Sequence, residues 1–104
     1  MKKKGLYLDD LRDLPEKYAD WDIARTYDEA IRMLEAHEYE AISLDHDLGC
    51  FEPITKREYT GYDVVYWLVE HKFAGGYVPT TYKVHSANPV GAKNMTDMIE
   101  RYLK

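Results

Sequence analysis

Cysteine is almost absent from this chain, and long apolar runs are absent altogether. The single cysteine, Cys50, cannot form an internal disulfide, which suits a protein kept in a reducing compartment. The apolar run behind the basic N-terminal residues stops at Leu8, short of the ~7 to 15 apolar residues of a secretory signal. No stretch approaches the ~20 apolar residues of a membrane span. We therefore expect a soluble, cytoplasmic protein with no membrane partner.

A surplus of positive charge is also missing. Lys and Arg number 14 against 19 Asp and Glu, which gives a net charge of -5. A broad nucleic-acid surface needs a Lys/Arg excess to neutralise phosphates, so we expect none, whereas a small phosphorylated ligand remains compatible. The 104 residues, 45% of them hydrophobic, can bury one modest core. We expect one domain over residues 1–104, of unknown oligomeric state.

Short apolar segments predict four strands. They are expected at residues 5–8, 22–25, 41–44 and 82–86. Residues 47–49 are expected to turn the chain away from the third strand. Residues 11–20 and 50–59 show no sustained period, so we expect two loops, the first with room for one helical turn and the second a candidate lid.

Capping residues and helical spacing predict three helices. A capping box at residues 26–29 starts the first helix, which should run to about His37. Thr60 can cap the second through Asp63. Asn88 and Pro89 are typical of the N-cap and first residue of the third helix, and we favour this capping role for Asn88 over a ligand contact.

The alternation of strands and helices favours an α/β fold with parallel strands. We expect a three-layer, flavodoxin-like architecture with a four-stranded parallel sheet in the order 2-1-3-4, covered on both faces. One helix is missing or shrunk between the first two strands. This order places strands one and three side by side, so Asp9 and Asp10 should lie near Asp45.

Polar and charged residues follow three of the predicted strands. The runs are Asp9-Asp10 with Arg12, Asp45-His46-Asp47, and His85-Ser86 with Asn88. Open α/β sheets bind ligands beyond the carboxyl ends of their strands, so we expect these three runs to share one crevice. Carboxylates, imidazoles and a guanidinium in one crevice indicate phosphate chemistry.

The residue types suit the opening of a cyclic phosphate, which needs proton transfer at a bridging oxygen and positive charge at the other oxygens. We place His46, His85, Asp45 and Asp47 in the catalytic group, with the two imidazoles as acid and base. We place Arg12, Arg25, Ser86 and Asn88 in the substrate-binding group, the arginines on the phosphate and the other two as hydrogen-bonding residues.

The acidic cluster of Asp9, Asp10 and Asp45 needs its own explanation, because clustered carboxylates repel one another and a phosphate. A divalent cation such as Mg²⁺ or Mn²⁺ bound to these three residues would neutralise them. Alternatively their pKa values are raised, or Asp47 or Asp10 pairs with a histidine and orients its ring. The sequence leaves these alternatives open.

The motifs resemble the receiver domain of two-component signalling, through the acidic pair 9–10, Asp45 and the Ser-Ala pair 86–87. The chain departs from that pattern because a fifth strand with its lysine is absent and histidines stand at positions 46 and 85. Taken together, Leu-Asp-Asp-Leu-Arg (8–12), Leu-Asp-His-Asp-Leu-Gly (44–49) and His-Ser-Ala-Asn (85–88) are similar to the cyclic-phosphate-processing receiver-like family. The resemblance spans nearly the whole chain.

That resemblance implies a truncated receiver domain that processes a cyclic phosphate. Our leading hypothesis is a phosphoesterase that acts on a cyclic phosphate of a nucleotide or an RNA end. One alternative is a non-catalytic module that binds a cyclic nucleotide or phosphate. The other is a degenerate receiver in which Asp45 accepts a phosphoryl group.

Overall fold

Short strands alternate with helices over residues 2–104, the part of the chain that the computed structural model describes. In chain order the elements are β1 (Lys3–Leu8), the 3-10 turn η1 (Glu16–Tyr18), β2 (Asp22–Ala24), α1 (Tyr27–Ala36), β3 (Tyr39–Leu44), β4 (Asp47–Phe51), β5 (Glu58–Thr60), α2 (Gly61–Phe73), β6 (Thr81–Val84) and α3 (Pro89–Tyr102). Within these residues, no helix combines the length and the apolar character that a membrane crossing requires.

Four of the strands form one parallel sheet in the order β2-β1-β3-β6. β6 is the fourth strand of this sheet along the chain, so the predicted order 2-1-3-4 is confirmed. Leu8 of β1 pairs with Leu44 of β3, which pairs in turn with Val84 of β6. The last residues of three strands therefore lie in one row across the sheet.

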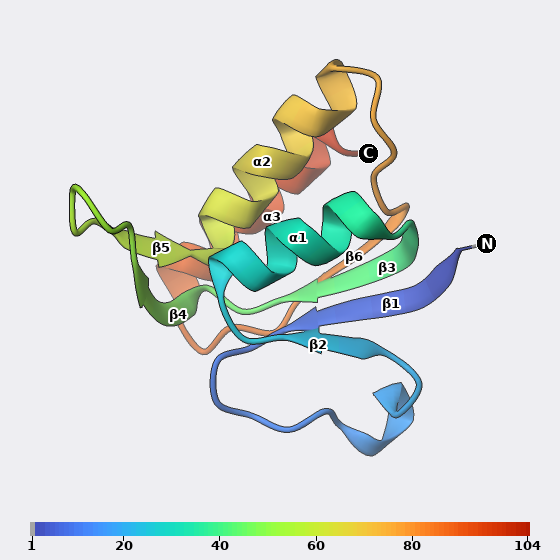
Figure 1. Cartoon of the computed structure of the whole chain (residues 1–104), viewed down its shortest axis with the longest axis horizontal. Helices are drawn as coiled ribbons and strands as arrows, with labels where there is room; N and C mark the ends of the chain where they lie inside the picture. The colour runs from blue at the N-terminus through green and yellow to red at the C-terminus, as the bar shows by residue number, and fades with distance from the viewer. Residues whose placement is uncertain (1) are drawn as a thin grey trace.

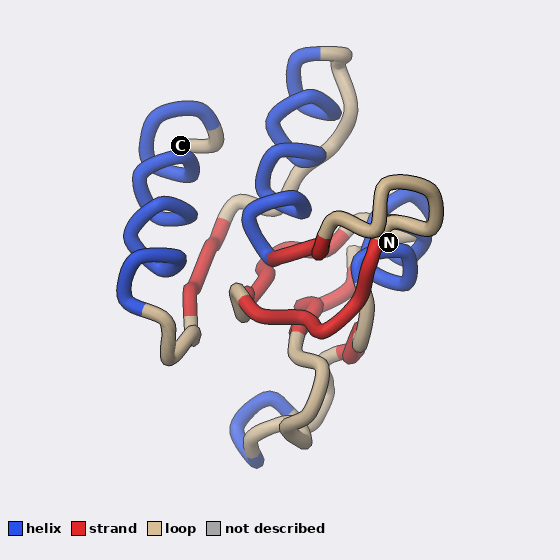
Figure 2. Tube along the Cα trace, turned by 90° about the vertical axis from the view of Figure 1, so that its left-hand side faces the viewer, coloured by secondary structure: helices blue, strands red, loops and turns tan. Residues whose placement is uncertain are grey.

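The two faces of the sheet are covered differently (Figures 1 and 2). α1, α2 and α3 lie on one face, and η1 with its flanking loop lies on the other. Leu6, Leu8, Ile42 and Leu44 point toward the helices and form the main core with residues of all three. The three-layer α/β fold is confirmed, and the segment between β1 and β2 provides the third layer in place of a helix.

Aromatic rings fill the thin layer between the sheet and η1. Tyr7 of β1 lies 5.8 Å from Tyr18, whose ring is 4.4 Å from Trp21 between centroids. Gly5 is needed beneath Trp21, because a Cβ atom at this position would lie 2.3 Å from the indole. The predicted single helical turn in this loop is present as η1.

The predicted helix starts are confirmed by their hydrogen bonds. Thr26 Oγ1 accepts from the amide of Glu29 at 3.1 Å. The amide of Thr60 donates to the Asp63 carboxylate at 2.8 Å, within a capping box at the start of α2. Asn88 Oδ1 accepts from the amide of Gly91 at 3.0 Å. Each cap satisfies a backbone N–H that has no partner inside its helix.

The predicted turn at residues 47–49 is wrong, and the loop predicted over 50–59 is confined to residues 52–57. β4 and β5 form an antiparallel hairpin in which Asp47 pairs with Thr60 and Phe51 with Glu58. Its tip places Lys56 at a φ of 63°, and the Glu52 carboxylate accepts from the amide of Ile54 at 3.0 Å. The strands are short and irregularly paired, so they lack the strict alternation by which a hairpin is predicted.

Candidate active site

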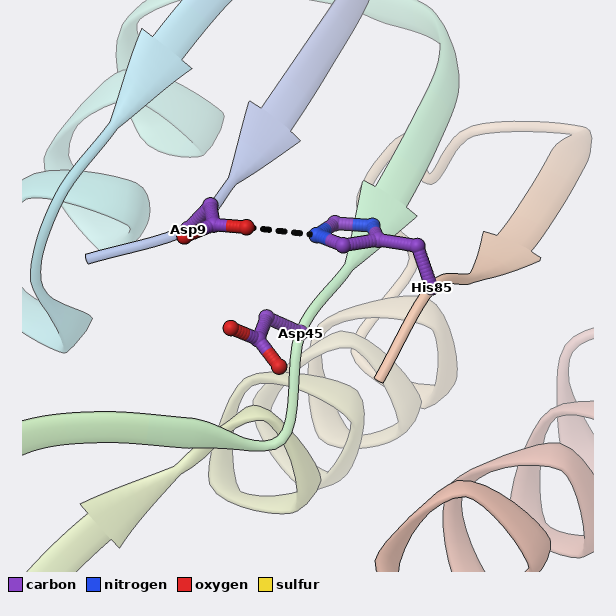
Figure 3. A group of neighbouring side chains, drawn as sticks. All are labelled: Asp9, Asp45 and His85. Carbon is purple, nitrogen blue, oxygen red and sulfur yellow. Dashed lines mark hydrogen bonds and ion pairs between the residues drawn. The ribbon is translucent and has the colours of Figure 1, made fainter. Parts of the chain in front are cut away.

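Three polar residues lie together at the carboxyl ends of β1, β3 and β6. Asp9, Asp45 and His85 each follow the last residue of a strand, and backbone hydrogen bonds hold them in place. The Asp45 amide donates to the Leu8 carbonyl at 3.0 Å, and the His85 amide donates to the Leu44 carbonyl at 2.9 Å. The parallel register itself therefore sets the three side chains side by side (Figure 3).

Asp9 is an ionised, buried carboxylate with 1% exposure. Its Oδ1 accepts from the amides of Leu11 at 3.0 Å and Arg12 at 2.9 Å, while its Oδ2 lies 3.2 Å from His85 Nε2. Burial alone would raise the pKa of Asp9, but the two amides and the nearby His85 and Arg12 hold it below its ordinary value. These contacts therefore favour the ionised form of Asp9.

Asp45 has the opposite electrostatic character. Its side chain is 8% exposed, and burial together with the neighbouring Asp9 charge raises its pKa. Oδ1 accepts from the amide of His46 at 2.8 Å, and the other oxygen accepts no hydrogen bond from the described residues. Asp45 thus carries a free acceptor beside a second carboxylate.

His85 connects Asp9 to a buried hydroxyl on β3. Its Nδ1 lies 2.8 Å from Ser43 Oγ, and its ring stacks on Tyr7 with 4.3 Å between centroids and 10° between planes. Burial lowers the pKa of His85 despite the attraction of Asp45 and Asp9, which favours the neutral ring. Because ionised Asp9 must accept, Nε2 carries the proton, and Nδ1 accepts from the Ser43 hydroxyl.

Sequence reasoning missed Ser43 and Tyr7, although a signal for both was present. Each stands two residues before a strand-end aspartate, and the two are register partners. Residues two apart in a strand share a face, so both side chains lie beneath the aspartates that follow them.

A small pocket of about 200 Å³ opens beside this cluster. It is lined by Asp9, Asp10, Leu11, Arg12, Asp45, Asp47 and Ala87. Arg12 Nη1 donates to the His85 carbonyl at 3.3 Å and lies 3.9 Å from Asp9 Oδ2. The lining therefore combines four carboxylates with one guanidinium, and its charge is negative.

Arg25 does not line this pocket. Its guanidinium donates to the Arg12 carbonyl at 2.6 Å and the Asp9 carbonyl at 3.3 Å, and it lies 3.5 Å from the Asp13 carboxylate. These contacts hold the backbone of residues 9–13 from behind, so Arg25 supports the position of Arg12.

His46 lies beside the pocket, against the first turn of α3. Its Nδ1 is 2.9 Å from Asp47 Oδ1. The ring fits closely over Gly91, where a Cβ atom would come within 2.4 Å of His46 Cγ. Glycine at position 91 therefore leaves room for the imidazole. Asp47, which contacts this imidazole, also lines the pocket.

Ser86 and Asn88 shape the turn that leads into α3. Ser86 Oγ accepts from the amide of Asn88 at 3.0 Å, and Asn88 Oδ1 is occupied as the helix cap. Neither residue lines the pocket, which receives only Ala87 from this turn. Their roles in substrate binding stay predictions.

Comparison with known families yields one match. Residues 4–101 match the family described as the cyclic-phosphate processing receiver domain, which covers nearly the whole chain. No curated protein and no solved structure matches it.

Proposed function

This chain belongs to the cyclic-phosphate processing receiver domain family, and we propose that it is a phosphoesterase that opens a cyclic phosphate of a nucleotide or an RNA end. The observation that carries the proposal is the convergence of Asp9, Asp45, Asp47 and Arg12 on one pocket at the carboxyl edge of the sheet. Ligand sites of open α/β sheets occupy this position.

Arg12 is the residue suited to hold the phosphate. Its side chain is 55% exposed, and its backbone is fixed by the Asp9 carboxylate and by Arg25. A guanidinium can bind two phosphate oxygens at once, and it stabilises the negative charge that grows on them in the transition state.

His46 is the better placed of the two imidazoles for moving a proton. Asp47 binds its Nδ1, which leaves Nε2 without a partner among the described residues. A carboxylate on one nitrogen orients the ring and leaves the other nitrogen free, so His46 can accept a proton from attacking water. Both nitrogens of His85 already have partners, so its acid–base role would require it to release Asp9 or Ser43.

The negative lining calls for a cation. Four carboxylates and one guanidinium surround the pocket, so an anionic phosphate would be repelled from the metal-free site. We propose that Mg²⁺ or Mn²⁺ binds at Asp9 and Asp45, with Asp10 at the rim. Such an ion, when bound, supplies Lewis-acid polarisation of a phosphate oxygen.

The proposal is tested with 2′,3′-cyclic and 3′,5′-cyclic AMP, each with Mn²⁺, with Mg²⁺ and with a chelator, and products are separated by chromatography. We expect cation-dependent ring opening of at least one compound. His46→Ala and His85→Ala should each lose about 10²-fold or more in kcat. His71→Ala is the matched control, because His71 stacks on Trp67 in α2, away from the pocket.

Two outcomes would contradict the proposal in different ways. Full activity in both His46→Ala and His85→Ala would remove the assigned residues from the mechanism. Binding of a cyclic nucleotide by calorimetry with no product under any condition would identify a binding module instead.

A further inference from the structure

We propose that the cation site of this pocket is a mixed oxygen and nitrogen site made by Asp9, Asp45 and His85, and that Ser43 enables His85 to act as a ligand. The inference rests on the pocket of the proposed function but not on turnover. It replaces the all-carboxylate set of Asp9, Asp10 and Asp45 expected from the sequence.

The geometry of the three side chains fits one ion. One ligand atom from each of Asp9, Asp45 and His85 lies within 4.8 Å of the other two. Asp9 Oδ2 and His85 Nε2 are 3.2 Å apart, close to the about 3 Å that separates neighbouring ligands with bonds of about 2.1 Å. The three side chains are therefore grouped closely enough to be candidate ligands of one ion (Figure 3).

Asp45 supplies a second, independent indication. More than nine-tenths of this residue is buried, yet one carboxylate oxygen has no hydrogen-bond donor among residues 2–104. In Figure 3 the Asp45 carboxylate lies beside Asp9 and His85, and no interaction joins it to either. A carboxylate with one unpaired oxygen beside a second, ionised carboxylate is stabilised when a cation binds to both.

In the tautomer described above, His85 Nε2 carries a proton and so has no lone pair for a metal. Ser43 allows the ring to change to the other tautomer. A hydroxyl can donate or accept, so Ser43 suits either tautomer of the ring. When a metal takes the lone pair of Nε2, that nitrogen gives up its proton and Nδ1 gains one, which it donates to Ser43 Oγ at the existing 2.8 Å contact. The imidazole stays neutral, and stacking on Tyr7 keeps its plane fixed.

A nitrogen ligand has a consequence for metal choice. Imidazole favours ions such as Zn²⁺ over Mg²⁺, which prefers oxygen ligands. His85 should therefore contribute much to the affinity for Zn²⁺ and little to that for Mg²⁺. Its hydrogen bond to Ser43 should matter as well, because the partner that orients a ligating histidine changes metal affinity by about 10- to 100-fold.

The test uses the whole protein without substrate, so that failed turnover and failed metal binding are told apart. Long-range ¹H–¹⁵N NMR of the histidine rings is recorded before and after Zn²⁺ addition. We expect the His85 proton to move from Nε2 to Nδ1. An unchanged His85 tautomer at saturating Zn²⁺ would overturn the inference, and this readout needs no variant.

Calorimetry with Zn²⁺ and with Mg²⁺ gives the second readout. We expect His85→Ala to weaken Zn²⁺ binding by at least about 10-fold and Mg²⁺ binding by under about 3-fold. His85→Asn serves if the alanine variant unfolds. Ser43→Ala should weaken Zn²⁺ binding by about 10-fold, whereas Ser43→Thr and His71→Ala should not. Equal losses for both ions in a folded His85 variant, or wild-type Zn²⁺ affinity in Ser43→Ala, would overturn it.

Discussion

Alternate residues of the same strands point to opposite faces of the central sheet, where one set forms the apolar core and the other supports the candidate site. On the helix-covered face, Leu8 and Leu44 are fully buried in the apolar core. On the opposite face, Tyr7 and Ser43 lie beneath His85 and hold its ring by stacking and by a hydrogen bond. Asp9 and Asp45 continue this second face past the strand ends. Toward the carboxyl ends of both β1 and β3, every second residue therefore belongs to the core, and the residues between them support the site.

The largest loss of stability is expected from truncating a side chain on the helix-covered face. Leu44→Ala should lower the free energy of unfolding by about 2–5 kcal/mol, because it leaves a cavity among packed side chains. Ser43→Ala, the adjacent change on the other face, removes one hydrogen bond and should cost about 1 kcal/mol. Urea denaturation followed by circular dichroism measures both. Similar losses would mean that the two faces contribute alike to stability.

The second largest change in stability is expected at the two site carboxylates, and it should have opposite signs at Asp9 and Asp45. In the presence of a chelator at neutral pH, Asp9→Asn should lower the free energy of unfolding by about 1–3 kcal/mol, since charge-assisted bonds from two amides are weakened. Asp45→Asn should raise it by about 1 kcal/mol, since the buried charge faces Asp9 and lacks a full set of partners. Thermal and urea unfolding of both variants test this. A loss in both would show that Asp45 is satisfied by the fold.

The smallest expected change in stability concerns Asp22, which lies at the amino-terminal ends of the strands, opposite the candidate site. The Tyr39 hydroxyl donates to Asp22 at 2.7 Å, and this bond, then Lys3, hold the pKa of Asp22 below its ordinary value against partial burial. A lowered pKa means that the stabilisation is present above the ordinary pKa of about 3.9 and is lost as pH falls through the folded-state pKa.

Asp22→Asn should therefore lower stability at pH 6 by under about 1 kcal/mol, because the carboxylate is partly exposed. The difference from wild type should shrink below pH 4, as seen in urea midpoints at pH 6, 4 and 3. Tyr39→Phe should behave in the same way, and both variants should keep the wild-type rate of cyclic-phosphate opening. A difference that grows in acid would contradict the assigned sign.

Much of the fold was accessible from local sequence. The strand ends at Leu8 and Leu44, the caps at Thr26 and Asn88, and the parallel order all follow from apolar periodicity and capping chemistry, whereas the last strand, expected over 82–86, spans Thr81–Val84. The hairpin of β4 and β5 was not accessible, because its strands pair only with each other through an irregular register.

The candidate site was accessible only in outline. The charged residues after each strand could be found, but not which of them line the pocket. His46 packs on Gly91, and Arg25 donates to the backbone carbonyl of Arg12. Neither contact produces a periodic pattern in the sequence. The functions assigned to them stay predictions.

Local sequence patterns are enough to predict the parallel α/β sheet and the grouping of Asp9, Asp45 and His85 beyond its strands, because parallel strands end on the same side of a sheet. The electrostatic state of these residues, in contrast, depends on tertiary contacts. The pKa of Asp9 falls and that of Asp45 rises because amides surround one carboxylate, while burial beside a like charge governs the other. Such differences arise from neighbours distant in the chain, which no local pattern records.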